Sequence, residues 1–335
     1  MKTKFNAIAA LLFSIAIATT LFLHSCVFNQ SNTLTPLRVG INQWPGFDIA
    51  LYAKEAGLFE QRGLDVQFSL FDVSQDTVRA LLRGSLDVGF TSIWELMQAD
   101  PGNDNPVYIM VTNISAGSDG IVTQSNIESM QALQGKKIST KLGTVSHLIL
   151  LEALQLHQIK PEAVRIEDVI NDIAVERMQD GSLDGAVLWE PALSETAAAI
   201  DGNIVFTTAD VDSLILDGLA TRSSFLASNR EMLTQFILAW FDLMHVVETN
   251  PDVVFETVGQ QLGQSRESFA KDYAGLKKGD IALNQRMFEP QGRLQETTHQ
   301  IAQLLRDDPR HSRIVREDVE INSGPVNDAI QRWKP

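Results

Sequence analysis

One pattern occurs twice in this 335-residue chain and limits what the chain can fold into. RGSLDVGFTS (83–92) and DGSLDGAVLWE (180–190) each have the form of a helix end, a Gly-Ser-Leu-Asp turn, a strand and a polar helix start. Strands and helices alternate around both copies, which predicts mainly parallel sheets with helices on both faces. We therefore expect an α/β fold in which one unit is repeated in each of two domains.

Periodicity and turn residues place the individual elements. Residues 216–221 are expected to return to the first sheet after the second domain is complete. Strands are expected at 37–42, 64–71, 86–90, 107–114, 120–124, 136–140, 163–170, 183–189, 203–208 and 216–221. Helices are expected at 48–59, 74–83, 145–157, 174–179, 191–200, 231–249, 252–262, 265–274, 290–307 and 325–333, with a further helix starting at Ser92.

The order of these elements predicts two lobes joined by two chain crossings. Lobe I comprises residues 37–115 and 216–335, and lobe II comprises residues 116–215. The crossings are expected near 114–118 and 210–215. Two short crossings make a hinge, and closure about a hinge buries a ligand between lobes.

The N-terminus has the features of a secretory signal. Lys2 and Lys4 precede an uncharged apolar run from Phe5 to Leu23, which predicts a signal peptide over residues 1–25. Leu23-His24-Ser25-Cys26 resembles the bacterial lipobox, in which the Cys is lipidated after cleavage, although His24 is unusual there. Residues 26–36 would then form a tether. Plain secretion and an uncleaved anchor remain alternatives.

Charge and residue counts exclude several function classes. A net charge of −15 argues against nucleic acid, which needs clustered Lys and Arg. The single Cys allows no internal disulfide, and the six scattered His predict no metal site. No nucleophilic triad or paired catalytic carboxylates are indicated, so we expect no catalytic residues and no cofactor.

The candidate ligand contacts follow strand ends, where open α/β sheets bind ligands. Trp44 and Phe47 could form an apolar wall or pack beneath their loop. Thr91 and Ser92 could face an anionic group or only cap a helix. Asp119, near the first crossing, could be a cleft carboxylate or a turn acid.

Two further junctions lie in the expected lobe II. Gly, Ser and Thr between Lys141 and His147 form an anion cradle at a helix start, and His147 is either a contact or a satisfied core residue. Trp189 could stack on a ligand, while Glu190 could accept from a donor or only favour the helix dipole.

The order of these motifs resembles the nitrate/taurine/aliphatic-sulfonate class of ABC importer binding proteins, which shares a fold with the thiamine-pyrimidine synthase family. RVGINQWPGF, RGSLDVGFTS, LQGKKISTKLGTVSH and LDGAVLWEP carry the resemblance. It implies a type II periplasmic-binding-protein fold, known as a venus flytrap. It also implies ligand contacts from Gln43, Trp44, Phe47, Thr91, Ser92, Thr144, Val145, Ser146, Trp189 and Glu190.

The resemblance implies a protein of the periplasm or of the outer face of the cytoplasmic membrane, which delivers a small molecule to a permease and ATPase. We expect a monomer, lipid-anchored through Cys26. The Cys-rich motif of the synthases is absent, since Cys26 is the only Cys. The ligand stays open between a sulfonate, an amine, an amino acid and a pyrimidine. A binding protein that signals to a receptor and feeds no permease is the alternative function.

Overall fold

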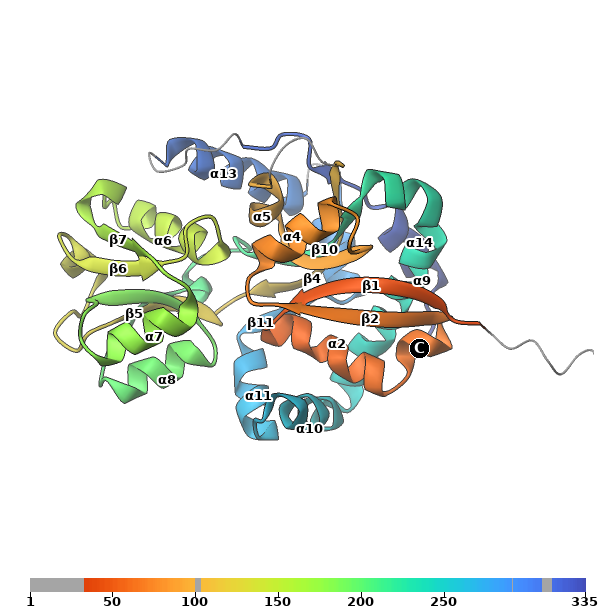
Figure 1. Cartoon of the computed structure of the whole chain (residues 1–335), viewed down its shortest axis with the longest axis horizontal. Coiled ribbons are helices and arrows are strands. Elements are labelled where there is room, and N and C mark those ends of the chain that lie inside the picture. Colours follow the sequence, from red (N-terminus) through yellow and green to blue (C-terminus); the bar gives the residue numbers. More distant parts are fainter. Residues whose placement is uncertain (1–32, 100–103, 291, 309–314) are drawn as a thin grey trace, which may run out of the picture. The chain divides into compact units, whose positions relative to one another are not determined.

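Two β-sheets organise the chain, which enters the second sheet between Ser115 and Asp119 and returns to the first between Thr207 and Leu216. The computed structural model describes residues 33–99, 104–290, 292–308 and 315–335 (Figure 1). Within it, Pro36–Pro335 form one compact unit. The predicted α/β class is confirmed, and 216–221 is confirmed as a strand of the first sheet. Residues 1–32, with Cys26 and the expected signal peptide, lie outside the described residues.

The larger sheet has seven strands in the order β11-β4-β10-β3-β1-β2, with β12 also paired to β4. Its members are β1 (Thr35–Asn42), β2 (Leu64–Phe71), β3 (Val88–Ser92), β4 (Pro106–Ser115), β10 (Leu216–Arg222), β11 (Leu276–Lys278) and β12 (Glu320–Ile321). The smaller sheet has five strands in the order β7-β6-β8-β5-β9. Its members are β5 (Asp119–Thr123), β6 (Lys137–Thr140), β7 (Arg165–Asp168), β8 (Gly185–Trp189) and β9 (Asn203–Thr207).

Strand direction in both sheets is mixed, where the sequence predicted mainly parallel pairing. β1 runs parallel to β3, and β6 runs parallel to β7 and β8. β10 is antiparallel to β3 and β4, and β5 is antiparallel to β8 and β9. β5 and β10 are the first strands after each change of sheet, so no crossover helix within one sheet forces them to run parallel.

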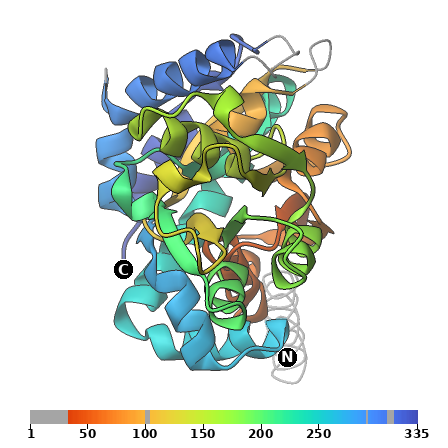
Figure 2. The same ribbon diagram turned by 90° about the vertical axis from the view of Figure 1, so that its left-hand side faces the viewer.

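Helices cover the sheets, and Figure 2 turns those of the smaller sheet toward the viewer. Those of the first half are α2 (Pro45–Glu55), α3 (Leu58–Gln61), α4 (Ser74–Leu82), α5 (Ile93–Met97), α6 (Val145–Leu156), α7 (Asn171–Gln179) and α8 (Ala192–Ala199). The C-terminal ones are α9 (Ser223–Thr249), α10 (Pro251–Leu262), α11 (Arg266–Ala274), α12 (Ile281–Met287), α13 (Arg293–Asp307) and α14 (Gly324–Arg332). Single 3₁₀ turns occupy Met130–Leu133, Pro161–Ala163 and Thr208–Asp210.

Helix boundaries differ from the prediction where Pro, Gly or Asn sets them. α2 begins at Pro45 because Pro suits the first helical position, and Gly57 (φ 69°) separates α2 from α3. α9 begins at Ser223 and is kinked at Asn229, whose backbone is not helical. The sequence prediction missed α12, a short helix of seven residues.

The core explains why every residue of β4 is buried. All ten of its residues are buried, and its two faces enter different cores. Ile109 packs into the core beneath α9, while Tyr108 and Val111 belong to the core beside α5 and α12. Both faces of this strand are covered by helices, so each side chain is removed from water, at about 1.5–3 kcal/mol for a large apolar residue.

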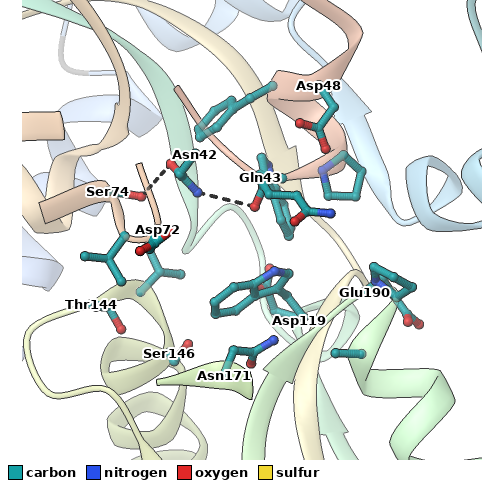
Figure 3. A pocket seen from close by; sticks show the side chains of 18 of the residues that line it. Asn42, Gln43, Asp48, Asp72, Ser74, Asp119, Thr144, Ser146, Asn171 and Glu190 are labelled. Atoms are coloured by element: carbon teal, nitrogen blue, oxygen red, sulfur yellow. Dashed lines mark hydrogen bonds between the residues drawn. The ribbon is translucent and has the colours of Figure 1, made fainter. Parts of the chain in front are cut away.

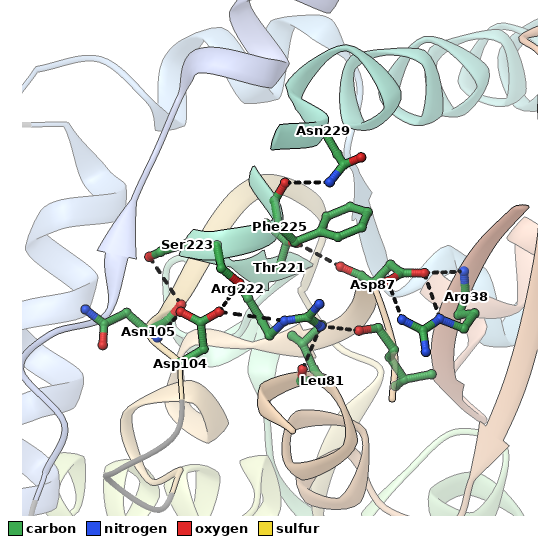
Figure 4. Close-up of polar contacts among 12 residues, drawn as sticks. Arg38, Leu81, Asp87, Asp104, Asn105, Thr221, Arg222, Ser223, Phe225 and Asn229 are labelled. Carbon is green, nitrogen blue, oxygen red and sulfur yellow. Dashed lines mark hydrogen bonds and ion pairs between the residues drawn. The ribbon is translucent and has the colours of Figure 1, made fainter. Parts of the chain in front are cut away.

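The two Gly-Ser-Leu-Asp copies form the same turn. Their glycines adopt positive φ, 83° at Gly84 and 75° at Gly181. Asp87 donates its N–H to the Arg38 carbonyl (2.9 Å) and accepts the Arg38 N–H at Oδ2 (3.0 Å; Figure 4). In the second copy, Asp184 donates its N–H to the Lys137 carbonyl (3.0 Å) and accepts the Lys137 N–H at Oδ2 (2.8 Å). Each Asp thus fastens the turn to the start of the neighbouring strand, which is why the motif is repeated.

Candidate functional site

A cavity of about 480 Å³ is lined by residues that follow strands of both sheets. Figure 3 shows Asn42, Gln43 and Asp48 on one side of it, with Ser146 and Asn171 opposite. The first residues of α2, α4, α6, α7 and α8 all line the cavity, because each of these helices follows a strand end. Its volume is that of an ordinary small-molecule site.

The Trp44 loop is held in place by a residue of strand β4. The Trp44 indole N–H donates to Asn113 Oδ1 across 3.1 Å, and both residues are buried. Gly46 makes this approach possible, because a Cβ at that position would lie 2.3 Å from Asn113 Nδ2. Phe47 packs its ring 5.1 Å from Phe90, so it belongs to the core as well as to the cavity wall.

Two amides from the larger sheet's helices reach a single carbonyl of the smaller sheet. Gln75 Nε2 donates to the Gly143 carbonyl at 2.7 Å, and Gln98 Nε2 donates to the same oxygen at 2.9 Å. Gly143 adopts φ 81°, and a Cβ there would lie 2.5 Å from Gln75 Nε2. This contact fastens the loop before α6 to α4 and α5.

Carboxylates dominate the polar lining of the cavity, which has nine acids and a single Lys among its described residues. Lys141 is already paired with Asp168 at 3.0 Å. The nine are Asp48, Asp72, Glu95, Asp119, Asp172, Glu190, Glu195, Asp217 and Asp272.

Burial perturbs the inner members of this group. It raises the pKa of Asp119 to about 7, with the negative charge of Glu190 adding to the effect and a hydrogen bond from Ser115 opposing it. Burial also raises the pKa of Asp272 to about 6, again with Glu190 contributing. The pKa of Asp217 lies well above its usual range, because it is buried beside Asp119 and Glu95.

Two of the acids have local structural roles. Glu95 Oε2 accepts from the Ser92 N–H (3.1 Å), the Ser92 hydroxyl (2.9 Å) and the Thr91 hydroxyl (3.1 Å), completing a capping box. Glu190 accepts from the N–H (3.1 Å) and the hydroxyl of Ser194 in α8. Glu190 therefore caps a helix, the simpler of its two expected roles, while also lining the cavity.

The structure brings nine of the twelve expected contact residues to the cavity and places three elsewhere. Thr91 and Ser92 are buried against Glu95 and do not line it, because their hydroxyls are used in the cap. His147 also points away, with Nε2 3.3 Å from Asp308 Oδ2. The nine that line it are Gln43, Trp44, Phe47, Asp119, Thr144, Val145, Ser146, Trp189 and Glu190.

Sequence reasoning missed several lining acids, chiefly Asp217 and Asp272. Asp217 had a usable signal, since it is the second residue of the strand expected to return to the first sheet beside the second crossing. Asp272 gave none, because α11 reaches the cavity only through its packing against α2 and α10. Across the described residues, no cluster of three or more His, Cys, Asp or Glu is arranged to hold a metal. In the same part of the chain, no helix is long and apolar enough to cross a membrane.

Comparisons with known proteins find binding proteins among the relatives of this chain. It is 27% identical over 256 residues to the taurine-binding periplasmic protein of Escherichia coli K12, covering 74% of this chain and 79% of the relative. The fold matches the periplasmic aliphatic sulphonate binding protein SsuA of Escherichia coli with a TM-score of 0.71 and 18% identity. The match covers 84% of this chain and 95% of SsuA. The periplasmic-binding-protein fold is thereby confirmed.

An enzyme shares the fold. The desulfurization enzyme DSZB matches with a TM-score of 0.61 and 15% identity, over 89% of this chain and 99% of the enzyme. Identity at that level shows the fold alone. Residues 44–252 match the family model described as NMT1/THI5 like, which is more than half of the chain. The chain therefore belongs to the NMT1/THI5-like family.

Proposed function

We propose that this chain is an extracytoplasmic solute-binding protein of an ABC importer, which captures a small polar molecule in the cavity between its two sheets. The observation that carries the proposal is the cavity itself, lined from both sheets by the strand-end residues expected from the sequence. The taurine-binding relative supports a binding role and a periplasmic location.

The two lobes follow the two sheets in this proposal, with residues 37–115 and 216–335 in one and 116–215 in the other. The crossings are tied together, because the Ser115 and Thr208 hydroxyls lie 2.7 Å apart and Thr208 accepts the Gly117 N–H at 2.8 Å. Bending at these crossings would open and close the cavity.

Ligand capture is tested by native mass spectrometry of the protein as purified from a bacterial periplasm, followed by small-angle scattering with and without the molecule found. We expect a bound small molecule, a rise in melting temperature when it is added back, and a smaller radius of gyration. A chain that carries nothing and gains no stability from any candidate would contradict the proposal.

We further propose binding without turnover. The family relative is a binding protein, whereas the enzyme neighbour is related by fold alone. Prolonged incubation with the identified ligand, followed by mass spectrometry, should return it unchanged. Any product formed by this protein and lost in the Asp119→Asn variant would indicate catalysis.

A lipid anchor at Cys26 completes the proposal. Lipidation would hold the binding protein at the membrane beside its permease, with residues 26–36 as a tether. Metabolic labelling with a fatty acid should mark the wild-type chain, and Cys26→Ser should lose the label and appear in the soluble fraction. Retention of the unlabelled variant in the membrane would argue for an uncleaved anchor.

A further inference from the structure

The cavity wall contains more negative charge than its own residues neutralise. Glu95, Asp119, Glu190, Asp217 and Asp272 come from five separate parts of the chain and all line the cavity. The pKa values of Asp119, Asp217 and Asp272 are raised by burial, and the negative charge of another acid of this group adds to each shift. The salt bridges among the described residues include none of the five, and the Lys that lines the cavity, Lys141, pairs with Asp168 instead. Burying carboxylates without a counter-charge is unfavourable, so the free protein holds them at a cost in stability.

Three of these acids also have an oxygen without a partner. Oδ2 of Asp119, of Asp217 and of Asp272 is buried and accepts no hydrogen bond from the described residues. Each of these side chains is at least nine-tenths buried, and each lines the cavity. Almost all buried acceptors in folded proteins are satisfied, so three unsatisfied ones at one cavity indicate a missing donor.

The helix N-termini at the cavity do not offset the negative charge of its wall. The helices α2, α7 and α8 begin at the cavity, but each carries an acid in its own first turn, namely Asp48, Asp172 and Glu195. Among the helices that start there, α6 alone has no first-turn acid. An anionic ligand group would meet one uncompensated helix N-terminus and several carboxylates.

Part of the remaining wall is apolar. Trp44, Trp189 and Phe269 line the cavity. Leu70 and Ile170, at the ends of β2 and at the start of α7, also line it and are 74% and 41% exposed. Aromatic faces attract cations, and exposed aliphatic side chains favour an apolar ligand surface.

We propose that the ligand is an organic cation, in which a protonated amine, quaternary ammonium or amidinium is carried on an apolar body. This inference rests on the proposed binding function and narrows it. The cationic group donates to, or neutralises, Asp119, Asp217 and Asp272, and the apolar body lies against Trp44 and Trp189. A sulfonate anion would add like charge to the same wall and is disfavoured.

A matched charge series tests the inference at pH 8. The probes are choline, taurine and isethionate as one series, and phenethylamine, phenylalanine and 3-phenylpropionate as another. Yeast extract separated by ion exchange into cationic, zwitterionic and anionic fractions extends the series. We expect melting temperature to rise with cations and the cationic fraction, and to stay unchanged with the others.

The outcomes separate the two proposals. Stabilisation by taurine, by the anions or by their fractions would overturn the cation inference and leave the binding function standing. Stabilisation by none of the probes or fractions would overturn both. Stabilisation by a cation supports both and supplies a ligand for titration.

Variants then locate the recognition. Asp119→Asn, Asp217→Asn and Asp272→Asn should each weaken the cation's binding at least tenfold, measured by calorimetry. Asp201→Asn is the control, because Asp201 is exposed and outside the cavity. Melting curves of the free variants report whether each is folded. Unchanged affinity in all three folded variants would overturn the assignment.

Discussion

The Trp44 indole N–H donates to Asn113 Oδ1 across 3.1 Å, although 69 residues separate the two. This bond joins the first strand-end loop of the cavity to β4 of the larger sheet. Asn113 Nδ2 is in turn held 3.3 Å from the Thr112 hydroxyl, which fixes the orientation of its amide. The position of Trp44 in the cavity is therefore set by a buried polar contact in addition to packing.

Removing that donor should affect both stability and ligand binding. Trp44→Phe leaves Asn113 Oδ1 buried without its partner, which should lower the free energy of unfolding by about 1–3 kcal/mol. Trp240→Phe is the matched control, since Trp240 Nε1 donates to the Gly279 carbonyl at 3.0 Å outside the cavity. Urea denaturation should show a loss in both variants, whereas ligand titration should show weaker binding in Trp44→Phe alone. Equal affinity in the two would show that Trp44 serves only the fold.

Two buried aspartates of the larger sheet should respond oppositely to neutralisation. Asp217 has no counter-charge, so Asp217→Asn should stabilise the free protein by about 1–2 kcal/mol at pH 7. Asp87 accepts from Arg38 Nε (2.9 Å) and Nη2 (2.6 Å), as Figure 4 shows, so Asp87→Asn should destabilise it by about 1–2 kcal/mol, a value discounted for the half-exposed Arg38. Denaturant midpoints measure both, and a destabilised Asp217→Asn would contradict the idea of unneutralised charge.

Stability of the free protein should fall as pH rises from about 4 to about 7. Asp119 has its pKa raised to about 7 by burial and by Glu190, and Asp272 has its pKa raised to about 6 by burial and by Glu190. Between pH 4 and these values, the unfolded chain has lost protons that the folded chain retains, so the slope of unfolding free energy with pH is negative. Above pH 7 this contribution is constant.

The same groups predict a pH dependence for binding. A cation binds ionised carboxylates more tightly than protonated ones, so its affinity should decrease as pH falls from 8 to 5. Between these pH values, binding of the cation should release protons from the carboxyl groups. The groups facing Asp119 are Ser115, Glu190 and Asp217, and the affinity of Asp119→Asn should vary less with pH. Calorimetry in two buffers of different ionisation enthalpy measures the released protons. A pH-independent affinity would contradict this prediction.

The two amides on the Gly143 carbonyl should favour closure of the cavity. Replacing both Gln75 and Gln98 with Ala removes two hydrogen bonds between the sheets, at about 0.5–1.5 kcal/mol each. We expect weaker ligand binding and a larger radius of gyration in the free protein by small-angle scattering. Gln67→Ala is the control, because Gln67 is exposed and its amide donates only to Asp65. An unchanged radius and affinity would show that these contacts do not influence closure.

Much of the fold was readable from local patterns. β2 was predicted with its exact bounds, because it alternates strictly between Leu64 and Phe71. The repeated turn was recognised because Gly84 and Gly181 supply positive φ that other residues rarely adopt. Strand direction was less accessible, since β5 and β10 take their direction from partners distant in sequence.

The residues of the cavity were also predictable only in part from the sequence. Strand-end positions such as Trp44, Thr144 and Trp189 were predicted because α/β sheets place ligands there. For Thr91 and Ser92 the sequence left a ligand contact and a helix cap open, because local spacing does not reveal that Glu95 uses both hydroxyls. Whether a polar residue caps a helix or faces a ligand depends on where neighbouring side chains point.

The sequence by itself determined the α/β class, the repeated unit and the edge of each sheet at which the cavity lies, since these depend on periodicity and turn chemistry within short segments. Only the tertiary structure decided the charge of the site. About a hundred residues separate Asp119 from Asp217, and some fifty separate Asp217 from Asp272. Each of the three alone is an ordinary acid. Folding places them at one cavity and removes water from them, which converts three unremarkable side chains into a candidate cation site.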